Sequence, residues 1–437
     1  MTQVVHLHVG APKSGTTFVQ QVLEHNRATL EEAGVLVAGP RLDLIHAAMA
    51  VRGDRRLADL PEDAAGAWDR IVEQVRSWPG RAAVVSYELF ANASADQARA
   101  ALARLDGLEV HVVVSARDLG QAIASSWQEQ LKFGLTRPLE QWSPPQESAA
   151  GSEWGWRTMQ PANVAARWGA DLPPERVHVV TVPSGGAGPD ELWHRFAEAT
   201  GLDAVAGLDL DVERANESLG VVEAELLRRV NVALDGRIRG GRQKSLWQRD
   251  LLAHTVLAPI GREPIGLTAA HLDEAAAEAE AAIAAITAAG HRVHGDLEDL
   301  RPSPRDARLP GEVTDAEVAG SAALALADLL VWARAAGADV RTPLDTDAEP
   351  APVGRADRIK GAVRGSLERV TSPVRDQRVV RLERRIAELE AEVARSRALH
   401  LRVATLSDVV AQLLLPAAQQ DEEITMQALR TYRDRSL

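Results

Sequence analysis

A short glycine-containing loop near the amino end carries residues with the chemistry of an anion-binding site. Residues 10–17 read Gly-Ala-Pro-Lys-Ser-Gly-Thr-Thr and follow a short apolar run. Glycines let the backbone approach an anion closely, and the free amides at the start of a helix donate hydrogen bonds to it. The hydroxyls of Ser14, Thr16 and Thr17 add donors, and Lys13 adds a positive charge. The sequence therefore predicts a site for a phosphate-bearing ligand.

The position of the lysine distinguishes this loop from the common loop that binds nucleoside triphosphates. Gly10 and Gly15 have the glycine spacing of the motif G-x4-G-K-[ST], but Thr16 stands where its lysine belongs. The lysine of this loop is Lys13, two residues before the second glycine. An ATP or GTP loop with altered chemistry and a fortuitous glycine-rich turn are the alternative interpretations.

A second group of polar residues follows the apolar run at residues 110–115. Arg117 comes at the end of this run, and Ser125 lies eight residues later in a predicted helix. Arginine presents a planar fork of donors to phosphate oxygens, and serine adds a short neutral donor. The alternatives are an ion pair of Arg117 with Asp118 and a hydrogen bond of the Ser125 hydroxyl to a backbone carbonyl.

Together the two motifs resemble those of sulfotransferases that use 3′-phosphoadenosine 5′-phosphosulfate (PAPS), and in particular bacterial sulfotransferase-domain proteins. The resemblance covers about residues 4–295. It implies that residues 13–17 bind the 5′-phosphosulfate, with Lys13 stabilising charge on the leaving oxygens. It further implies that Arg117 and Ser125 bind the 3′-phosphate, that PAPS is the cosubstrate, and that no metal is required.

Transfer to a hydroxyl also needs a general base, which in sulfotransferases is a histidine or a glutamate. Glu88 follows the apolar run at residues 81–87, at the expected carboxyl edge of a sheet, where open α/β sheets bind ligands. His46 lies beyond the first predicted helix. We favour Glu88 over His46 as the general base. The alternatives are a helix N-terminal carboxylate for Glu88 and a partly buried, hydrogen-bonded histidine for His46.

Further residues are candidates for the rim of the site. Asn216 and Ser218 are candidate helix caps in a segment that closes over donor or acceptor in the resembling family. A basic loop that would cover the 3′-phosphate contains Arg239, Arg242 and Lys244. Tryptophans that would stack on adenine or on a sugar, unless they belong to the core, are Trp127, Trp154 and Trp156.

These residues need a scaffold of alternating strands and helices. Short apolar runs that predict buried strands occupy residues 4–9, 81–87, 110–115 and 176–182. Helical spacing between them covers residues 64–76, 94–105, 119–132 and 191–200. Such alternation indicates a parallel sheet covered on both faces. The predicted fold class is therefore α/β, with a P-loop-like central parallel sheet flanked by helices.

The chain continues into a helical C-terminal extension and a short coiled coil. The predicted divisions are a PAPS-binding domain at 1–295, an accessory helical segment at 296–340, a linker at 341–375 and a coiled-coil tail at 376–437. Apolar residues at 3–4 spacing in the tail are Val379, Leu382, Ile386, Leu389 and Val393. This seam predicts a possible homodimer.

Composition excludes several classes of protein. A net charge of −13 argues against nucleic-acid binding, and the absence of cysteine excludes disulfides and thiolate metal sites. No apolar run of about 18 residues and no signal peptide are recognised, so we expect a cytoplasmic protein without a transmembrane segment. The predicted acceptor is a hydroxyl or amine of a carbohydrate, glycolipid or small molecule. A P-loop nucleotide kinase and a non-catalytic sulfotransferase-like scaffold are the alternatives.

Overall fold

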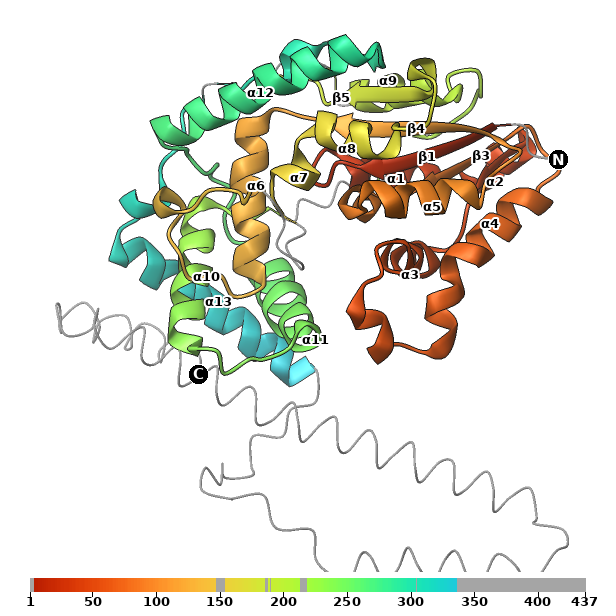
Figure 1. Cartoon of the computed structure of the whole chain (residues 1–437). Coiled ribbons are helices and arrows are strands. Elements are labelled where there is room, and N and C mark those ends of the chain that lie inside the picture. Colours follow the sequence, from red (N-terminus) through yellow and green to blue (C-terminus); the bar gives the residue numbers. More distant parts are fainter. Residues whose placement is uncertain are drawn as a thin grey trace, which may run out of the picture. The chain divides into compact units, whose positions relative to one another are not determined.

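The computed structural model describes residues 4–146, 154–184, 188, 190–212, 218–303 and 305–335 (Figure 1). The chain divides into two compact units, Met1–Thr314 and Asp315–Leu437, and each is treated by itself. The predicted linker at 341–375 and the predicted coiled-coil tail at 376–437 lie outside the described residues.

The first unit is built on a six-stranded parallel sheet of order β2-β3-β1-β4-β5-β6. The strands are β1 (Val4–Gly10), β2 (Val35–Val37), β3 (Ala82–Ser86), β4 (Glu109–Ala116), β5 (Val177–Thr181) and β6 (Arg292–His294). Most strand residues are buried valines and alanines, which is typical of strands covered on both faces. The predicted α/β class with a central parallel sheet is confirmed.

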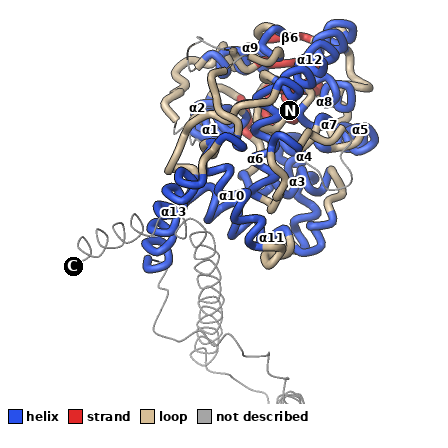
Figure 2. Tube along the Cα trace, turned by 90° about the vertical axis from the view of Figure 1, so that its left-hand side faces the viewer, coloured by secondary structure: helices blue, strands red, loops and turns tan. Residues whose placement is uncertain are grey.

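Two groups of helices cover the two faces of the sheet. One hydrophobic cluster joins the sheet to α3 (Arg41–Val51), α4 (Ala67–Ser77), α5 (Ala95–Ala103) and α8 (Pro161–Trp168). A second cluster joins the opposite face to α1 (Thr16–His25), α2 (Arg27–Glu32) and α9 (Glu191–Thr200). Figure 2 shows the strands enclosed by these helices.

A third group of helices lies beside the sheet, at the left of Figure 1, where α6 packs against α10, α12 and η6. The members of this region are α6 (Leu119–Lys132), α7 (Trp156–Met159), α10 (Val221–Leu234), α11 (Gly241–Lys244), the π-helical η6 (Ser245–Leu257) and α12 (Ala269–Ala289). Short 3-10 turns are η1 (Arg55–Asp59), η2 (Glu62–Gly66), η3 (Glu88–Asn92), η4 (Leu139–Gln141), η5 (Pro174–Arg176), η7 (Leu297–Leu300) and η8 (Pro310–Glu312).

The direction of the chain across the sheet reverses at β1. From β1 the chain passes to β2 and β3 on one side, and then crosses to β4 on the other side. In open α/β sheets, ligands bind at the carboxyl ends of the strands where this reversal opens a crevice. The loop after β1, Glu88 after β3 and Arg117 after β4 all leave the sheet at this point.

The second unit contributes one described helix, α13 (Asp315–Ala335), which lies within the accessory helical segment predicted at 296–340. Among the described residues it alone is long and apolar enough to cross a membrane by length and composition. Core helices of soluble proteins pass the same test.

Candidate functional site

The loop after β1 turns sharply before α1 begins. Lys13 and Gly15 both have left-handed backbone conformations, with φ of 63° and 73°. A Cβ on Gly15 would meet only the end of the Leu192 side chain of α9, which can turn away, so the left-handed backbone is the main reason that glycine suits this position. The Ala11 amide donates to the Ser115 carbonyl of β4 over 2.9 Å. Within the described part of the chain, no acceptor takes the amides of residues 13–17, which leaves them available to an anion.

Arg117 ties the end of β4 to this loop. Its Nη1 donates to the backbone carbonyl of Lys13 over 2.6 Å, and its Nη2 donates to the Gln121 side chain. Its buried Nε has no hydrogen-bond partner among the described residues. Burial lowers the pKa of Arg117 to about 10, opposed by Asp118 and reinforced by Arg305. The guanidinium therefore stays charged at neutral pH, and its buried Nε–H has no partner among the described residues.

The ammonium of Lys13 lies against helix α6. Its Nζ is 2.6 Å from Oε1 of Glu129, and the same oxygen accepts from Lys132 Nζ over 2.7 Å. The ammonium is also 5.9 Å from the centre of the Trp154 ring. Glu129 is one helical turn after Ser125, which corresponds to about 6 Å along the helix axis. The loop thus meets the α6 region at two points: its backbone at Arg117, just before the helix begins, and the Lys13 ammonium at Glu129, near the end of the helix.

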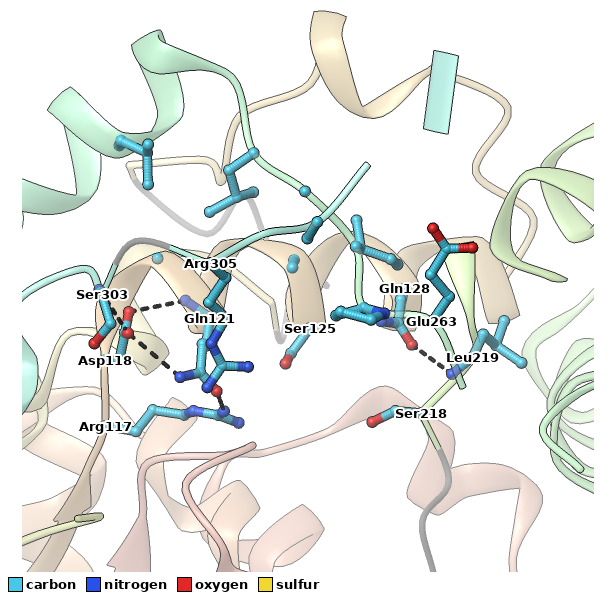
Figure 3. Close-up of a pocket in the computed structure, with 18 of the residues that line it drawn as sticks. Arg117, Asp118, Gln121, Ser125, Gln128, Ser218, Leu219, Glu263, Ser303 and Arg305 are labelled. Atoms are coloured by element: carbon cyan, nitrogen blue, oxygen red, sulfur yellow. Dashed lines mark hydrogen bonds between the residues drawn. The ribbon is translucent and has the colours of Figure 1, made fainter. Parts of the chain in front are cut away.

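A cavity of about 310 Å³ opens along α6 (Figure 3). Arg117 and Gln121 lie at one end of the cavity, and Ser125 lies in the middle. Gln128 lies at the other end, where its side-chain oxygen accepts a hydrogen bond of 2.8 Å from the Leu219 amide. Arginine and serine at the predicted offset therefore line a single cavity.

The rest of the cavity wall adds positive charge. Arg262 and Arg305 line the cavity with exposed side chains, and no carboxylate of the described residues pairs with either. The acidic lining residues are already engaged. Asp118 accepts from the Gln121 and Ser303 amides, and Glu263 accepts two hydrogen bonds of 2.8 Å from Arg308. The wall as a whole suits an anionic ligand.

Arg262 and Arg305 were not predicted, and the basic residues that were predicted lie elsewhere. Lys244 donates to the Phe133 carbonyl over 2.8 Å, and Arg239 donates to the Gly236 carbonyl. Neither residue lines the cavity, and Arg242 does not line it either. The only sequence signal for these two residues of the cavity wall was their position near prolines in two separate loops.

The two candidate bases occupy neighbouring elements outside the cavity wall. Glu88 begins η3, and its Oε2 accepts from Gln20 Nε2 over 2.8 Å. The Glu88 carbonyl lies so close to Gly10 that a Cβ there would come within 2.7 Å of it. His46 lies on α3, which packs against η3. The structure brings Glu88 to the base of the loop and His46 to the helix behind it.

The remaining candidates are two tryptophans in the core and two residues of the segment before α10. Trp127 and Trp156 are fully buried and donate to Arg137 and Glu274, so neither can stack on a ligand. Ser218 lines the cavity, and Asn216 lies outside the described residues.

A buried histidine missed by the sequence reasoning supports the edge of the sheet beneath the loop. The His8 ring bonds Ser86 of β3 over 2.8 Å and Ser115 of β4 over 2.9 Å. Burial lowers its pKa to about 3, so the ring is neutral and acts as one donor and one acceptor. Alternating histidines in β1 were its only sequence signal.

Comparison with known proteins gives one match. Residues 382–436 match a family model described as a domain of unknown function (DUF6752), a segment outside the described residues. No curated protein and no solved structure matches the chain. The interpretation of function therefore rests on the site itself.

Proposed function

We propose that the chain is a sulfotransferase that moves a sulfuryl group from PAPS to a hydroxyl or amine of a carbohydrate, glycolipid or small metabolite. The observation that carries the proposal is the hydrogen bond from Arg117 to the Lys13 carbonyl, at a cavity that Ser125 also lines. It brings the main chain of the loop into contact with the Arg117 side chain. Residues 10–17 do not themselves line the cavity, so the proposal requires the nucleotide to extend from the cavity to the loop. In this proposal the loop is a P-loop-like cradle for the 5′-phosphosulfate.

Lys13 and the adjoining amides act on the leaving group. Sulfuryl transfer requires the acceptor oxygen, the sulfur and the leaving oxygen to lie in line, by analogy with phosphoryl transfer. Lys13 neutralises charge that develops on the leaving phosphate oxygen, and the amides of residues 13–17 donate to the same group. To do this, Lys13 must exchange Glu129 for the ligand.

Arg117 and Ser125 hold the opposite end of the nucleotide. Arg117 has an uncommitted buried Nε, and Ser125 is half-buried in the cavity wall. Arg262 and Arg305 add charge at the rim of this wall. The cavity volume of about 310 Å³ is at the lower end of the range of small-molecule sites.

Glu88 accepts the proton of the acceptor hydroxyl. Its carboxylate is oriented by the 2.8 Å hydrogen bond from Gln20, and its backbone contacts the loop at Gly10. A general base must lie within reach of the attacking hydroxyl, which places the acceptor between Glu88 and Lys13.

Ligand-dependent stability tests the proposal and separates it from its alternatives. Adenosine 3′,5′-bisphosphate at a hundredfold excess over Kd is expected to raise the free energy of unfolding by about 2.7 kcal/mol. Lys13→Ala is expected to reduce this shift, whereas Lys244→Ala, which removes a lysine bound to the Phe133 carbonyl, leaves it unchanged. A shift with ATP and Mg²⁺ alone favours a nucleotide kinase. No shift with either ligand favours a non-catalytic scaffold.

Turnover is tested by incubating the protein with a host cell extract and PAPS that carries labelled sulfate. We expect label in a small-molecule or glycan fraction, lower by about 10²–10³-fold for Lys13→Ala and unchanged for Lys244→Ala. Equal labelling by the Lys13 variant would remove this residue from the mechanism.

A further inference from the structure

We infer that Glu129 is the counter-ion that holds Lys13 when no anion is bound, and that Lys132 allows Lys13 to leave it. Glu129 thereby positions Lys13 and sets the anion affinity of the loop. The inference rests on the proposed function only for the identity of the ligand, because the three charged groups are defined by the structure alone.

The three side chains meet at one oxygen. Oε1 of Glu129 is 2.6 Å from Lys13 Nζ and 2.7 Å from Lys132 Nζ. Glu129 and Lys132 are three residues apart on α6, so their pair is formed within one helix. Lys13 reaches the same oxygen from the loop after β1, which is 116 positions earlier than Glu129.

Burial distinguishes the two lysines. The Lys132 side chain is 1% exposed and that of Glu129 is 7% exposed, whereas the Lys13 side chain is 30% exposed. Lys132 is therefore enclosed with the carboxylate, while Lys13 has room to turn toward a ligand at the loop. Lys13 is the partner that can exchange.

The carboxylate is ionised while both lysines are in place. Burial by itself would raise the pKa of Glu129, but Lys13 and Lys132 outweigh burial and hold that pKa at about 2. A buried carboxylate without a partner is strongly unfavourable. Because Lys132 remains in place, the departure of Lys13 does not leave Glu129 unpaired.

The arrangement predicts opposite effects on anion affinity for substitutions of Glu129 and of Lys132. Removing the charge of Glu129 frees Lys13 and strengthens anion binding at the loop. Removing the charge of Lys132 leaves Glu129 with Lys13 alone, so Lys13 is held more firmly and anion binding weakens. A purely structural cluster predicts lower stability in both variants and no opposite shifts in affinity.

The experiment measures the Kd of inorganic sulfate and of adenosine 3′,5′-bisphosphate by isothermal titration calorimetry. For Glu129→Gln we expect sulfate to bind about tenfold more tightly, and for Lys132→Met about tenfold more weakly. The double variant Lys13→Ala/Glu129→Gln is expected to lose the gain. The matched control is Glu225→Gln, which removes another buried carboxylate shared by two cations, Arg228 and Arg229. It is expected to leave sulfate affinity unchanged.

The outcomes separate this inference from the proposed function. Opposite shifts in sulfate affinity without any bisphosphate binding support the inference and overturn the sulfotransferase proposal. Bisphosphate binding with sulfate affinity unchanged or undetectable in every variant overturns the inference and leaves the proposal standing. If Glu129→Gln does not fold, Lys132→Met decides the matter, because tighter or unchanged binding in that variant contradicts the inference.

Discussion

The guanidinium of Arg117 donates to the backbone carbonyl of Lys13 across 2.6 Å and 104 positions of sequence. This hydrogen bond fixes the main chain of the loop and leaves the lysine side chain to interact elsewhere. The same guanidinium keeps its buried Nε without a partner among the described residues. Arg117 therefore shapes the loop and also presents positive charge to the cavity.

Replacing Arg117 by lysine is expected to weaken bisphosphate binding by about 10- to 100-fold. Lysine keeps the charge but cannot supply the fork of donors that reaches both the Lys13 carbonyl and the cavity. Each charged hydrogen bond contributes about 1.5–3 kcal/mol. Calorimetric titration with adenosine 3′,5′-bisphosphate measures the loss.

The matched control for this variant is Arg167→Lys. Arg167 is likewise half-buried, donates to the carbonyls of Ala91, Ala93 and Arg157, and has a pKa lowered by burial to about 10. It does not line the cavity. We expect a lower melting temperature with unchanged affinity. Equal affinity losses in the two variants would show that the effect of Arg117 is only structural.

Gly15→Ala tests the shape of the loop. Gly15 has φ of 73°, and an added Cβ would push aside the end of the Leu192 side chain. Gly107→Ala is the control, because Gly107 has φ of 83° with no atom within 4 Å of the added carbon. Backbone strain costs about 1 kcal/mol in both variants. We expect the Gly15 variant to unfold at lower urea concentration than the control and to lose bisphosphate binding.

Glu88→Gln and His46→Gln identify the general base. If Glu88 accepts the proton, its variant loses about 10²–10⁴-fold in turnover and still binds the bisphosphate. His46→Gln is expected to retain turnover, because His46 lies on α3 behind η3. Turnover is measured as transfer of labelled sulfate at saturating PAPS. The reverse pattern would assign the base to His46.

The central strands were predictable because they are short runs buried on both faces. The predicted apolar runs agree to within one residue at each end with four strands, β1, β3, β4 and β5. β2 was missed because its three residues, Val35–Val37, are too few to show a pattern. β6 is equally short, with strand at Arg292–His294 and a 3-10 turn after it.

The site was predictable only where its residues are close in sequence. The spacing of the loop and of Arg117 with Ser125 is local, so a motif can show it. The partners of Lys13 are not local, since Glu129 approaches it through the packing of α6 against the loop. Arg262 and Arg305 come from later segments that line the same cavity as α6. The spacing of apolar residues in the sequence does not show that these segments pack there.

A row of histidines crosses the sheet and gives the first unit a pH-dependent stability. His6 of β1, His111 of β4, His178 of β5 and His294 of β6 have successive ring centres 5.4, 5.1 and 5.2 Å apart. Hydrogen bonds join His111 to His178 over 2.8 Å and His178 to His294 over 3.0 Å. Glu109 accepts from Nε2 of His111, the second ring of the row.

Burial and the neighbouring histidines lower the pKa of His6 and of His178 to about 3, and burial alone lowers the pKa of His8 to the same value. In the unfolded chain these groups titrate near 6.5. Between pH 6.5 and 3 the unfolded state therefore binds more protons than the folded state. Folding stability is complete above pH 6.5 and falls as the pH decreases toward 3.

Urea unfolding between pH 7.5 and pH 4.5 measures this dependence. Below pH 6.5 each of these histidines is expected to contribute up to about 1.4 kcal/mol per pH unit to the slope of the unfolding free energy. His178→Gln removes one titrating group from the row and is expected to give a shallower slope. His25→Gln is the control, because His25 is exposed and pairs with Asp209 at the surface. An unchanged slope in the His178 variant would show that the row does not govern acid stability.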